Sequence, residues 1–396
     1  MGMKPKKETR EKILVLLNDA DILWELQRRG VRRYCRLRGW DFVEAKLGSR
    51  LSRLRPLFDS VKPVGVLSAL WYQIRNRLPP GFPVVYFDCP SSIVPPFAPH
   101  IRHDAHATAH LAARELTALK CRAYAYVAFS EPSEWSNERE RCFAEEILRR
   151  GGRLLPTFCP PETRRLEILV PAFREWLRGV PRRCGIFCAN DKMAEAVVLA
   201  ANELGYPIPA DIAVVGVDNE EDRCLGCSPS ITSIAPDWEG SGFRACSALD
   251  DLLRGKIDPA HHFFLPLGIA RRESTGRQLV RSDPMVIRAV SMIHEHACEG
   301  LRAEDVLRSM HCSRRLAEMR FRESTGSSIL EEIRRVRFES AKALLARTSS
   351  SVESIANRCG YASVATFCRE FRRETDMTPE AWRKKAKSAA TAPMFL

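Results

Sequence analysis

Short apolar runs typical of β-strands alternate with helical segments from residue 11 to about residue 275, and this alternation constrains the fold more than any other feature. Alternation of this kind predicts parallel sheets covered by helices on both faces. Eight strand–helix units fit either one closed barrel or two doubly wound lobes. The proline-rich run 90–99 indicates a crossing between lobes, so we expect two lobes rather than a barrel.

The expected strands of this part are 13–17, 40–45, 64–68, 84–87, 123–129, 153–158, 185–189 and 212–217. The helices expected between and after them are 22–37, 104–119, 137–150, 164–177, 192–204 and 238–253.

Beyond residue 284 every periodic segment is typical of a helix, and Pro284 suits a first helical position. Capping boxes are predicted at Ser328-x-x-Glu331 and Ser350-x-x-Glu353. The expected helices are 284–297, 303–310, 314–323, 329–346, 352–358 and 363–375. We therefore expect an α/β domain over 11–275, a linker over 276–283, an all-α domain over 284–386 and a disordered tail over 387–396.

The chain carries 62 Lys and Arg against 49 Asp and Glu, a net charge of +13. The stretch 281–396 is about twice as basic per residue as the remainder, which favours an anionic partner for the C-terminal part. No apolar run reaches the roughly 18 residues of a membrane helix, and no export signal is evident. We expect a cytoplasmic, nucleoid-associated bacterial protein without a membrane partner.

The fourteen cysteines are scattered through apolar segments, so buried free thiols are expected. The pair Cys224–Cys227 lacks a second pair at zinc-site spacing, and the histidines at 100, 103, 106 and 110 lack a carboxylate partner other than Asp104. Searches for GxSxG, a P-loop, HExxH and a strand-linked GxGxxG find none. We expect no metal site, no cofactor and no catalytic residue.

One pattern occurs twice in the helical region, about fifty residues apart. Each copy has a short helix, a tight turn, a second helix opened by Ser313 or Ser363, and an aromatic–basic pair. This is the layout of a helix-turn-helix unit, whose second helix enters the major groove of DNA. Arginines cluster on and after each second helix, where they suit phosphate contacts.

The region from about 285 to 386 resembles the DNA-binding domain of AraC/XylS-type transcription regulators. The residues that carry the resemblance are Ile355, Ala356, Cys359, Gly360, Tyr361, Ser363, Phe367, Phe371, Arg372, Thr378 and Pro379. It implies two helix-turn-helix units joined by a long helix over 329–346. The DNA-binding residues that it implies by position are Arg314, Arg315, Glu318 and Met319 in the first unit, and Val364, Ala365, Cys368 and Arg369 in the second.

Two residues of the first unit depart from the family pattern. His311 stands where glycine is usual, and histidine tolerates a positive φ. Ala317 replaces a larger apolar residue, which predicts looser packing. The alternative interpretation of the region is an all-α structural domain with a solvated basic face.

In the α/β part, polar pairs close two apolar strands: Asn190-Asp191 and Asp218-Asn219. Parallel sheets bind ligands at the carboxyl ends of their strands. Carboxylate and amide groups suit the vicinal hydroxyls of a sugar. The structural alternative makes Asp104 a helix N-cap, Arg139 a surface ion-pair partner and Asn219 a turn residue. We favour this alternative for Asp104, and ligand contact for Asn190 and Asp218.

Residues 11–275 resemble the effector domain of LacI/GalR-type repressors, which is similar to periplasmic sugar-binding proteins. The resemblance implies an effector cleft with contacts from Arg139, Asn190 and Asp218. We add Asn18 and Asp19 at the first strand end, and Trp135 as an apolar platform for a sugar ring. A LacI-type repressor begins with a DNA-binding headpiece, whereas here the expected DNA-binding domain lies at the other end.

A sugar sensor followed by an AraC-type domain predicts a sequence-specific transcription regulator controlled by a small effector, a sugar such as xylose. The expected partners are double-stranded DNA half-sites, a pentose, a second copy of the chain in a homodimer, and RNA polymerase. Two alternatives stay open: the same architecture responding to a non-sugar metabolite, and an α/β enzyme with a DNA-binding appendage.

Overall fold

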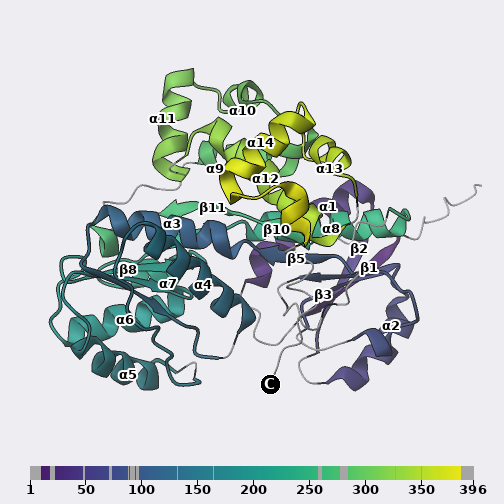
Figure 1. Cartoon of the computed structure of the whole chain (residues 1–396). Coiled ribbons are helices and arrows are strands. Elements are labelled where there is room, and N and C mark those ends of the chain that lie inside the picture. Colours follow the sequence, from purple (N-terminus) through teal and green to yellow (C-terminus); the bar gives the residue numbers. More distant parts are fainter. Residues whose placement is uncertain are drawn as a thin grey trace, which may run out of the picture. The chain divides into compact units, whose positions relative to one another are not determined.

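The structure is a computed structural model and describes residues 10–17, 23–47, 50–70, 74–87, 89, 94, 98–131, 133–163, 165–256, 261–276, 284–325, 327–348 and 350–384 (Figure 1). The chain divides into two compact units. The first unit, here the first lobe, is Met1–His103 with Asp237–Phe264. The second is Asp104–Pro236 with Leu265–Leu396. Its α/β part is called the second lobe, and residues 284–384 the helical domain.

The first lobe is built on a six-stranded sheet in the order β10-β5-β4-β3-β1-β2, with every pairing parallel. Its strands are β1 (Lys12–Leu17), β2 (Asp41–Lys46), β3 (Gly65–Ser68), β4 (Val84–Phe87), β5 (His100–His103) and β10 (His261–Phe264). Its helices are α1 (Trp24–Arg38), α2 (Leu54–Val61) and α8 (Trp238–Leu253). Apolar side chains of β1 alternate between two buried clusters, one shared with α1 and α8 and the other with α2, so helices cover both faces.

Helices α1 and α8 cross so closely that glycines are required at the contact. A Cβ atom on Gly30 would lie 1.8 Å from the carbonyl oxygen of Glu239, and one on Gly242 would lie 2.1 Å from that of Gln27. Real side chains never approach backbone atoms so closely, so the absence of Cβ permits this crossing.

The second lobe contains a five-stranded sheet in the order β11-β9-β8-β7-β6. Its strands are β6 (Ala123–Val127), β7 (Cys184–Cys188), β8 (Ile212–Val217), β9 (Thr232–Pro236) and β11 (Pro266–Ala270). All pairings are parallel except that of β11, an antiparallel edge strand. One face packs on α3 (Ala105–Ala118) and α4 (Glu134–Arg149). The other packs on α5 (Leu166–Arg178), α6 (Asp191–Glu203) and α7 (Glu221–Gly226).

The helical domain has two buried clusters. Its helices are α9 (Pro284–His296), the 3₁₀ turn η5 (Ala297–Glu299), α10 (Ala303–Ser309), α11 (Arg314–Thr325), α12 (Ile329–Arg347), α13 (Val352–Arg358) and α14 (Val364–Thr375). The first half of α12 belongs to the cluster of α9–α11, and its second half to that of α13 and α14. The long helix therefore joins two small cores, as the resemblance implies.

The two-lobed fold is confirmed, but one expected crossing point is wrong. The chain passes between the units at His103–Asp104, Pro236–Asp237 and Phe264–Leu265, whereas the described residues of the expected crossing, 94, 98 and 99, belong to the first lobe. Strands β5, β9, β10 and β11 and helices α2 and α7 were not expected. Residues 153–158 form only two isolated bridges with β6, at Leu154 and Phe158, in place of the expected strand.

Helix starts agree with most of the predicted caps. The Oδ1 atom of Asp104 accepts a hydrogen bond from the backbone N of Ala107 at 2.7 Å, which confirms it as the N-cap of α3. Ser328 and Glu331 form the expected capping box of α12. The box predicted at Ser350 is wrong by one residue, because Ser351 caps α13 by accepting from the backbone N of Ser354.

Candidate nucleic-acid interface and strand-end polar site

The first helix-turn-helix unit consists of α10 and α11 around a turn at His311. This residue has a φ of 47°, so the expected left-handed turn without glycine is confirmed. Val306, Ala317 and Phe321 are fully buried in the cluster that joins the two helices. The small side chain of Ala317 therefore lies inside this core.

The second unit consists of α13 and α14 around Gly360, whose φ is 74°. A Cβ atom at this position would also lie 3.1 Å from the carbonyl oxygens of Ala297 and Cys298. Both the conformation and the crowding favour glycine here. The Oγ atom of Ser363 accepts from the backbone N of Thr366 at 3.2 Å and starts α14.

Helix α11 presents the predicted reading residues on the face opposite its core. Arg314 and Arg315 are exposed, Glu318 is half-buried, and Met319 is 49% exposed. The exposed side chain of Met319 and the neighbouring arginines give this face of α11 both apolar and charged contact area. Arg314 and Arg315 could contact the phosphates or bases of a DNA duplex, and Met319 could make an apolar contact with it.

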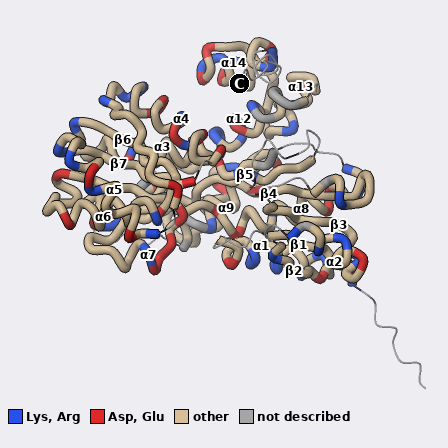
Figure 2. The backbone as a smooth tube through the Cα atoms, turned by 90° about the horizontal axis from the view of Figure 1, so that it is seen from below, with Lys and Arg blue, Asp and Glu red and all other residues tan. Residues whose placement is uncertain are grey.

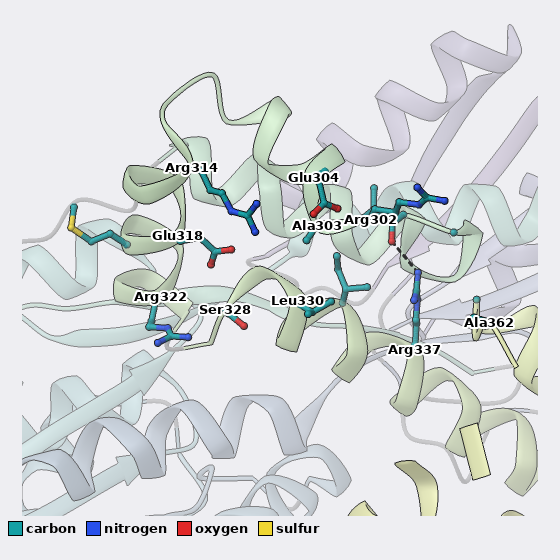
Figure 3. Close-up of a pocket in the computed structure, with 15 residues that line it drawn as sticks. Arg302, Ala303, Glu304, Arg314, Glu318, Arg322, Ser328, Leu330, Arg337 and Ala362 are labelled. Atoms are coloured by element: carbon teal, nitrogen blue, oxygen red, sulfur yellow. Dashed lines mark hydrogen bonds between the residues drawn. The ribbon is translucent and has the colours of Figure 1, made fainter. Parts of the chain in front are cut away.

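A groove of about 850 Å³ lies beside this face, between α11 and α12 (Figure 3). Arg314, Glu318 and Arg322 point into it from successive turns of α11, facing Leu330 on α12. Its charged lining residues are Arg302, Arg314, Arg322, Arg337, Glu304 and Glu318. Four guanidinium groups against two carboxylates make the groove attractive to an anionic backbone.

Sequence reasoning missed Arg302 and Arg337 as lining residues. Arg337 donates from Nε to the carbonyl oxygen of Ala297 at 2.8 Å and from Nη2 to that of Leu301 at 2.9 Å. It thereby ties the segment that follows α9 to α12. The contacts span about forty residues of sequence, so no local pattern could have revealed them.

Helix α14 separates its predicted residues into two groups. Ala365 and Arg369 are exposed, whereas Val364 and Cys368 are half-buried and pack against the cluster of Phe367 and Phe371. Arg372 and Arg373 continue the exposed basic face toward the end of the helix. Along the whole chain, basic and acidic positions are interspersed (Figure 2).

A buried ionic cluster anchors α12 against α9. Glu332 lies 2.6 Å from Nη2 of Arg335 and 3.4 Å from Nε2 of His294. Burial alone would raise the pKa of Glu332, but Arg335 and His294 lower it well below its usual range. The carboxylate is thus held charged by the guanidinium group of Arg335 and the hydrogen bond with His294.

In the second lobe, the predicted residues Asn190 and Asp218 follow the neighbouring strands β7 and β8 at matching positions of the strand register. Phe187 of β7 pairs with Val215 of β8, and Asn190 and Asp218 each follow three residues later. Since adjacent strands are about 4.8 Å apart, the two residues leave the sheet side by side. The Oδ1 atom of Asn190 caps α6 by accepting from the backbone N of Met193 at 3.0 Å, which leaves its amide NH₂ as the group suited to a ligand.

The turn after β8 has an unusual backbone. Asp218 has a φ of 107° and Asn219 one of 52°. Non-glycine residues with such values concentrate at functional sites. The backbone N of Asp218 donates to the carbonyl oxygen of Ile234 at 2.9 Å, and the Oδ1 atom of Asn219 accepts from Nη2 of Arg272 at 2.7 Å.

Asp191, which sequence reasoning did not select, supports this turn from beneath. It is fully buried and accepts from Oγ of Ser233 at 2.6 Å and from the backbone N of Glu220 at 2.8 Å. Burial raises the pKa of Asp191 to about 7. A Cβ on Gly216 would lie 2.2 Å from its Oδ1 atom, so glycine is needed to seat the carboxyl group.

Helix α4 brings two further predicted residues to the end of β7. Arg139 is 4% exposed and donates from Nη1 to the carbonyl oxygen of Ala189, next to Asn190. Its guanidinium carbon lies 4.9 Å from the ring centroid of the half-buried Trp135. Arg139, Trp135 and Asn190 are therefore brought together, while Asn18 and Asp19 lie outside the described residues.

The cysteines have no disulfide partners, and most are buried. Within the described part of the chain, no three His, Cys, Asp or Glu side chains converge as a metal site would require. None of the described helices has the length and apolar character needed to cross a membrane.

Comparison with known proteins identifies two domains in this chain. Residues 113–275 match a periplasmic binding protein-like domain, and residues 306–385 match a helix-turn-helix domain. The chain is 30% identical over 271 residues to the xylose operon regulatory protein of Escherichia coli (strain K12), covering 66% of this chain and 67% of that protein. These matches confirm both resemblances that the sequence predicted.

Solved structures agree with this division. The structure of the xylose-binding transcription activator XylR gives a TM-score of 0.56 at 25% identity and covers 96% of this chain and 99% of that one. A dimeric lac repressor gives a TM-score of 0.55 at 17% identity and covers 68% of this chain and all of the repressor chain. This second likeness concerns the fold alone.

Proposed function

Because the chain belongs to the family of the xylose operon regulatory proteins, we propose that it is a transcription regulator whose DNA binding responds to a sugar. Its relatives are transcription regulators and not enzymes. The observation that carries the proposal is the presence of two helix-turn-helix units, which end in α11 and α14, in the same compact unit as a polar site at the carboxyl ends of β7 and β8.

The proposed effector is a pentose, with xylose as the first candidate. The relatives' names support this choice, and so does the chemistry of the strand-end site. Asp218 would accept hydrogen bonds from two hydroxyls, Asn190 would donate, and Trp135 would cover an apolar face of the sugar ring. Arg139 would fix the start of α6 through its bond to the carbonyl oxygen of Ala189. Asn18 and Asp19 remain predicted effector contacts on sequence grounds.

The proposed nucleic-acid partner is a double-stranded operator read in two successive major-groove segments. Arg315 and Arg369 are the residues best suited to base edges, and Arg314 to phosphate. Glu318, Met319, Val364, Ala365 and Cys368 would supply the remaining contacts. The proposal divides the chain into a sensor over 11–275, a linker over 276–283, and a DNA-binding domain over 284–386.

We further propose a homodimer, by analogy with the lac repressor chain of similar fold, acting in the bacterial cytoplasm together with RNA polymerase. A dimer would present four reading helices to two half-sites. Sedimentation of the purified chain with and without a duplex tests this assembly, and a monomer at every concentration would contradict it.

The first test is a thermal-shift titration of the purified chain with xylose, arabinose, ribose and glucose. A sugar at about 100 times its dissociation constant adds about 2.7 kcal/mol to the stability of the domain that binds it. We expect a rise in melting temperature with a pentose, and loss of that rise in Asp218→Ala. The matched control is Asp222→Ala, an exposed carboxylate four residues away, which should retain the rise.

Three outcomes separate the alternatives. A shift with xylose that Asp218→Ala abolishes supports sensor, site and ligand class together. A shift that survives in Asp218→Ala moves the binding site away from the end of β8. No shift with any sugar, followed by a shift with another metabolite, would mean the same architecture responding to a different effector.

A further inference from the structure

The first helix-turn-helix unit shares one apolar core with the second lobe. Ala107 of α3 and Leu265 beside β11 belong to the same buried cluster as Val286 and Ile293 of α9 and Phe321 of α11. Leu267 of β11 packs against this cluster as well. The first reading helix is therefore seated directly on the lobe that carries the strand-end site.

A polar contact holds the end of that reading helix. Nη1 of Arg114, on α3, donates to the carbonyl oxygen of Thr325 at 2.6 Å. Thr325 is the last residue of α11, and the last carbonyl groups of a helix have no partner within the helix. A guanidinium group at this end satisfies one of them and complements the helix dipole. The orientation of α11 is thus tied to α3.

The residue after Arg114 faces the opposite way, into the lobe. Glu115 is 2% exposed and accepts from Nε of Arg271 at 2.8 Å and from Oγ1 of Thr275 at 3.2 Å. Burial and the charge of Arg271 lower the pKa of Arg114 to about 10. The buried guanidinium group of Arg271 and the half-buried one of Arg114 thus interact electrostatically with each other and with Glu115, so the position of one affects the energy of the other.

The residue after Arg271 reaches the strand-end site. Arg272 is 5% exposed, donates from Nη1 to the carbonyl oxygen of Ile231 at 2.8 Å, and from Nη2 to Oδ1 of Asn219 at 2.7 Å. Asn219 adjoins Asp218, whose backbone is strained. Three hydrogen bonds, Arg272–Asn219 at 2.7 Å, Arg271–Glu115 at 2.8 Å and Arg114–Thr325 at 2.6 Å, thus connect this turn to the end of α11. They are joined through the backbone, because Arg271 and Arg272 are neighbours in the sequence and so are Arg114 and Glu115.

We propose that this buried chain of charged residues is the route by which the effector controls the first reading helix, with Arg114 as the residue that positions α11. The inference rests on the proposed function, since it concerns how that site is read out. A ligand held by Asp218 changes the energy of the Asp218–Asn219 turn and so the bond from Arg272. The effector acts on DNA affinity only to the extent that this bond differs between the two states.

The test measures DNA affinity with and without xylose in the full chain. The probe is the duplex that the wild-type chain enriches from a randomised pool. The variants are Arg114→Gln, which removes the contact to Thr325, and Asn219→Gly, which removes the acceptor for Arg272 but accommodates a φ of 52°. The control is Arg122→Gln, an exposed arginine shortly after α3.

Coupling between two sites usually changes affinity by about 5- to 150-fold. In the wild-type chain, xylose changes the DNA affinity by a certain factor. In both variants we expect this factor to be at least fivefold smaller, and thus closer to one, while the xylose-induced thermal shift is retained. Because both residues lie on one route, the double variant should lose no more than the larger single loss. A wild-type ratio in Arg114→Gln, or additive losses in the double variant, would overturn the proposal.

Hydrogen–deuterium exchange tests the proposed route without any effector. If the route exists, Asn219→Gly raises deuterium uptake in the last turn of α11, far along the sequence, while uptake in α14 stays unchanged. Unchanged uptake in α11 contradicts the route even if no sugar binds. An absent thermal shift in the wild-type chain would instead contradict the proposed effector, so the two failures are distinguishable.

Discussion

At the scale of single residues, α14, the proposed second reading helix, offers one exposed arginine among its four predicted DNA-binding residues. Of the four residues implied on α14, Val364 and Cys368 partly face the core and Ala365 is small. Arg369 is exposed and is the one of the four that can form paired hydrogen bonds with guanine. Specificity in the second half of the site should therefore depend strongly on it.

We expect Arg369→Ala to weaken binding to the enriched duplex by about 1–3 kcal/mol, because a bidentate base contact is lost. Binding to a duplex of random sequence should change much less. Fluorescence anisotropy with both duplexes measures the difference, with Arg36→Ala on α1 as a charge-matched control. An equal loss on both duplexes would assign Arg369 to phosphate contact.

At the scale of elements, the crossing of α1 and α8 limits what the first lobe tolerates. Gly30 and Gly242 let the two backbones touch, and Cys35 and Cys246 are buried in the cluster beside them. A single added methyl group at the contact must force the helices apart.

We expect Gly242→Ala to destabilise the first lobe by about 1–3 kcal/mol, since the added carbon meets backbone rather than a movable side chain. The control is Gly226→Ala, where no atom lies within 4 Å of the added carbon. Urea denaturation followed by circular dichroism compares the two variants. Equal midpoints for both would show that the crossing relaxes without cost.

The elements also show what sequence patterns can and cannot predict. Strands β1 and β8 are unbroken apolar runs and were predicted to within one residue. Strand β5 reads His-Ile-Arg-His and was missed, because its pairing partners rather than its composition make it a strand. Helix α2 contains a proline within its first turn, which obscured its start.

The same distinction holds for the strand-end site. Asn190 and Asp218 were predicted because each directly follows an apolar strand. The supporting contacts of Asp191 and Arg271 were not predicted, because their partners Ser233 and Glu115 are 42 and 156 residues away in the sequence. Local patterns predict the residues that end a strand, but they contain no information on long-range hydrogen bonds.

At the scale of the whole molecule, a net charge of +13 favours association with nucleic acid of any sequence. The charge is spread over the chain, and acidic side chains neutralise part of it (Figure 2). We therefore expect non-specific attraction of DNA to be weak over most of the surface. It should be strongest where several arginines are exposed together, as on α14.

We expect the logarithm of the DNA association constant to fall linearly with the logarithm of salt concentration, by about 0.9 for each phosphate neutralised. Arg372→Gln should reduce this slope by about 1 and leave sequence preference intact. Arg32→Gln, on the first lobe, serves as the control. An unchanged slope in Arg372→Gln would mean that the end of α14 does not touch the phosphate backbone.

Only the first of the two helix-turn-helix units shares its described core with the second lobe, and this difference has an evolutionary consequence. The core of the first unit includes Ala107 and Leu265 of the second lobe, whereas the described residues in the core of the second lie between 298 and 382. Mutations in the first unit must remain compatible with the sensor. The second unit can diverge, or be exchanged by recombination within α12, while the response to the effector is inherited unchanged. New operators can thus be acquired one half at a time.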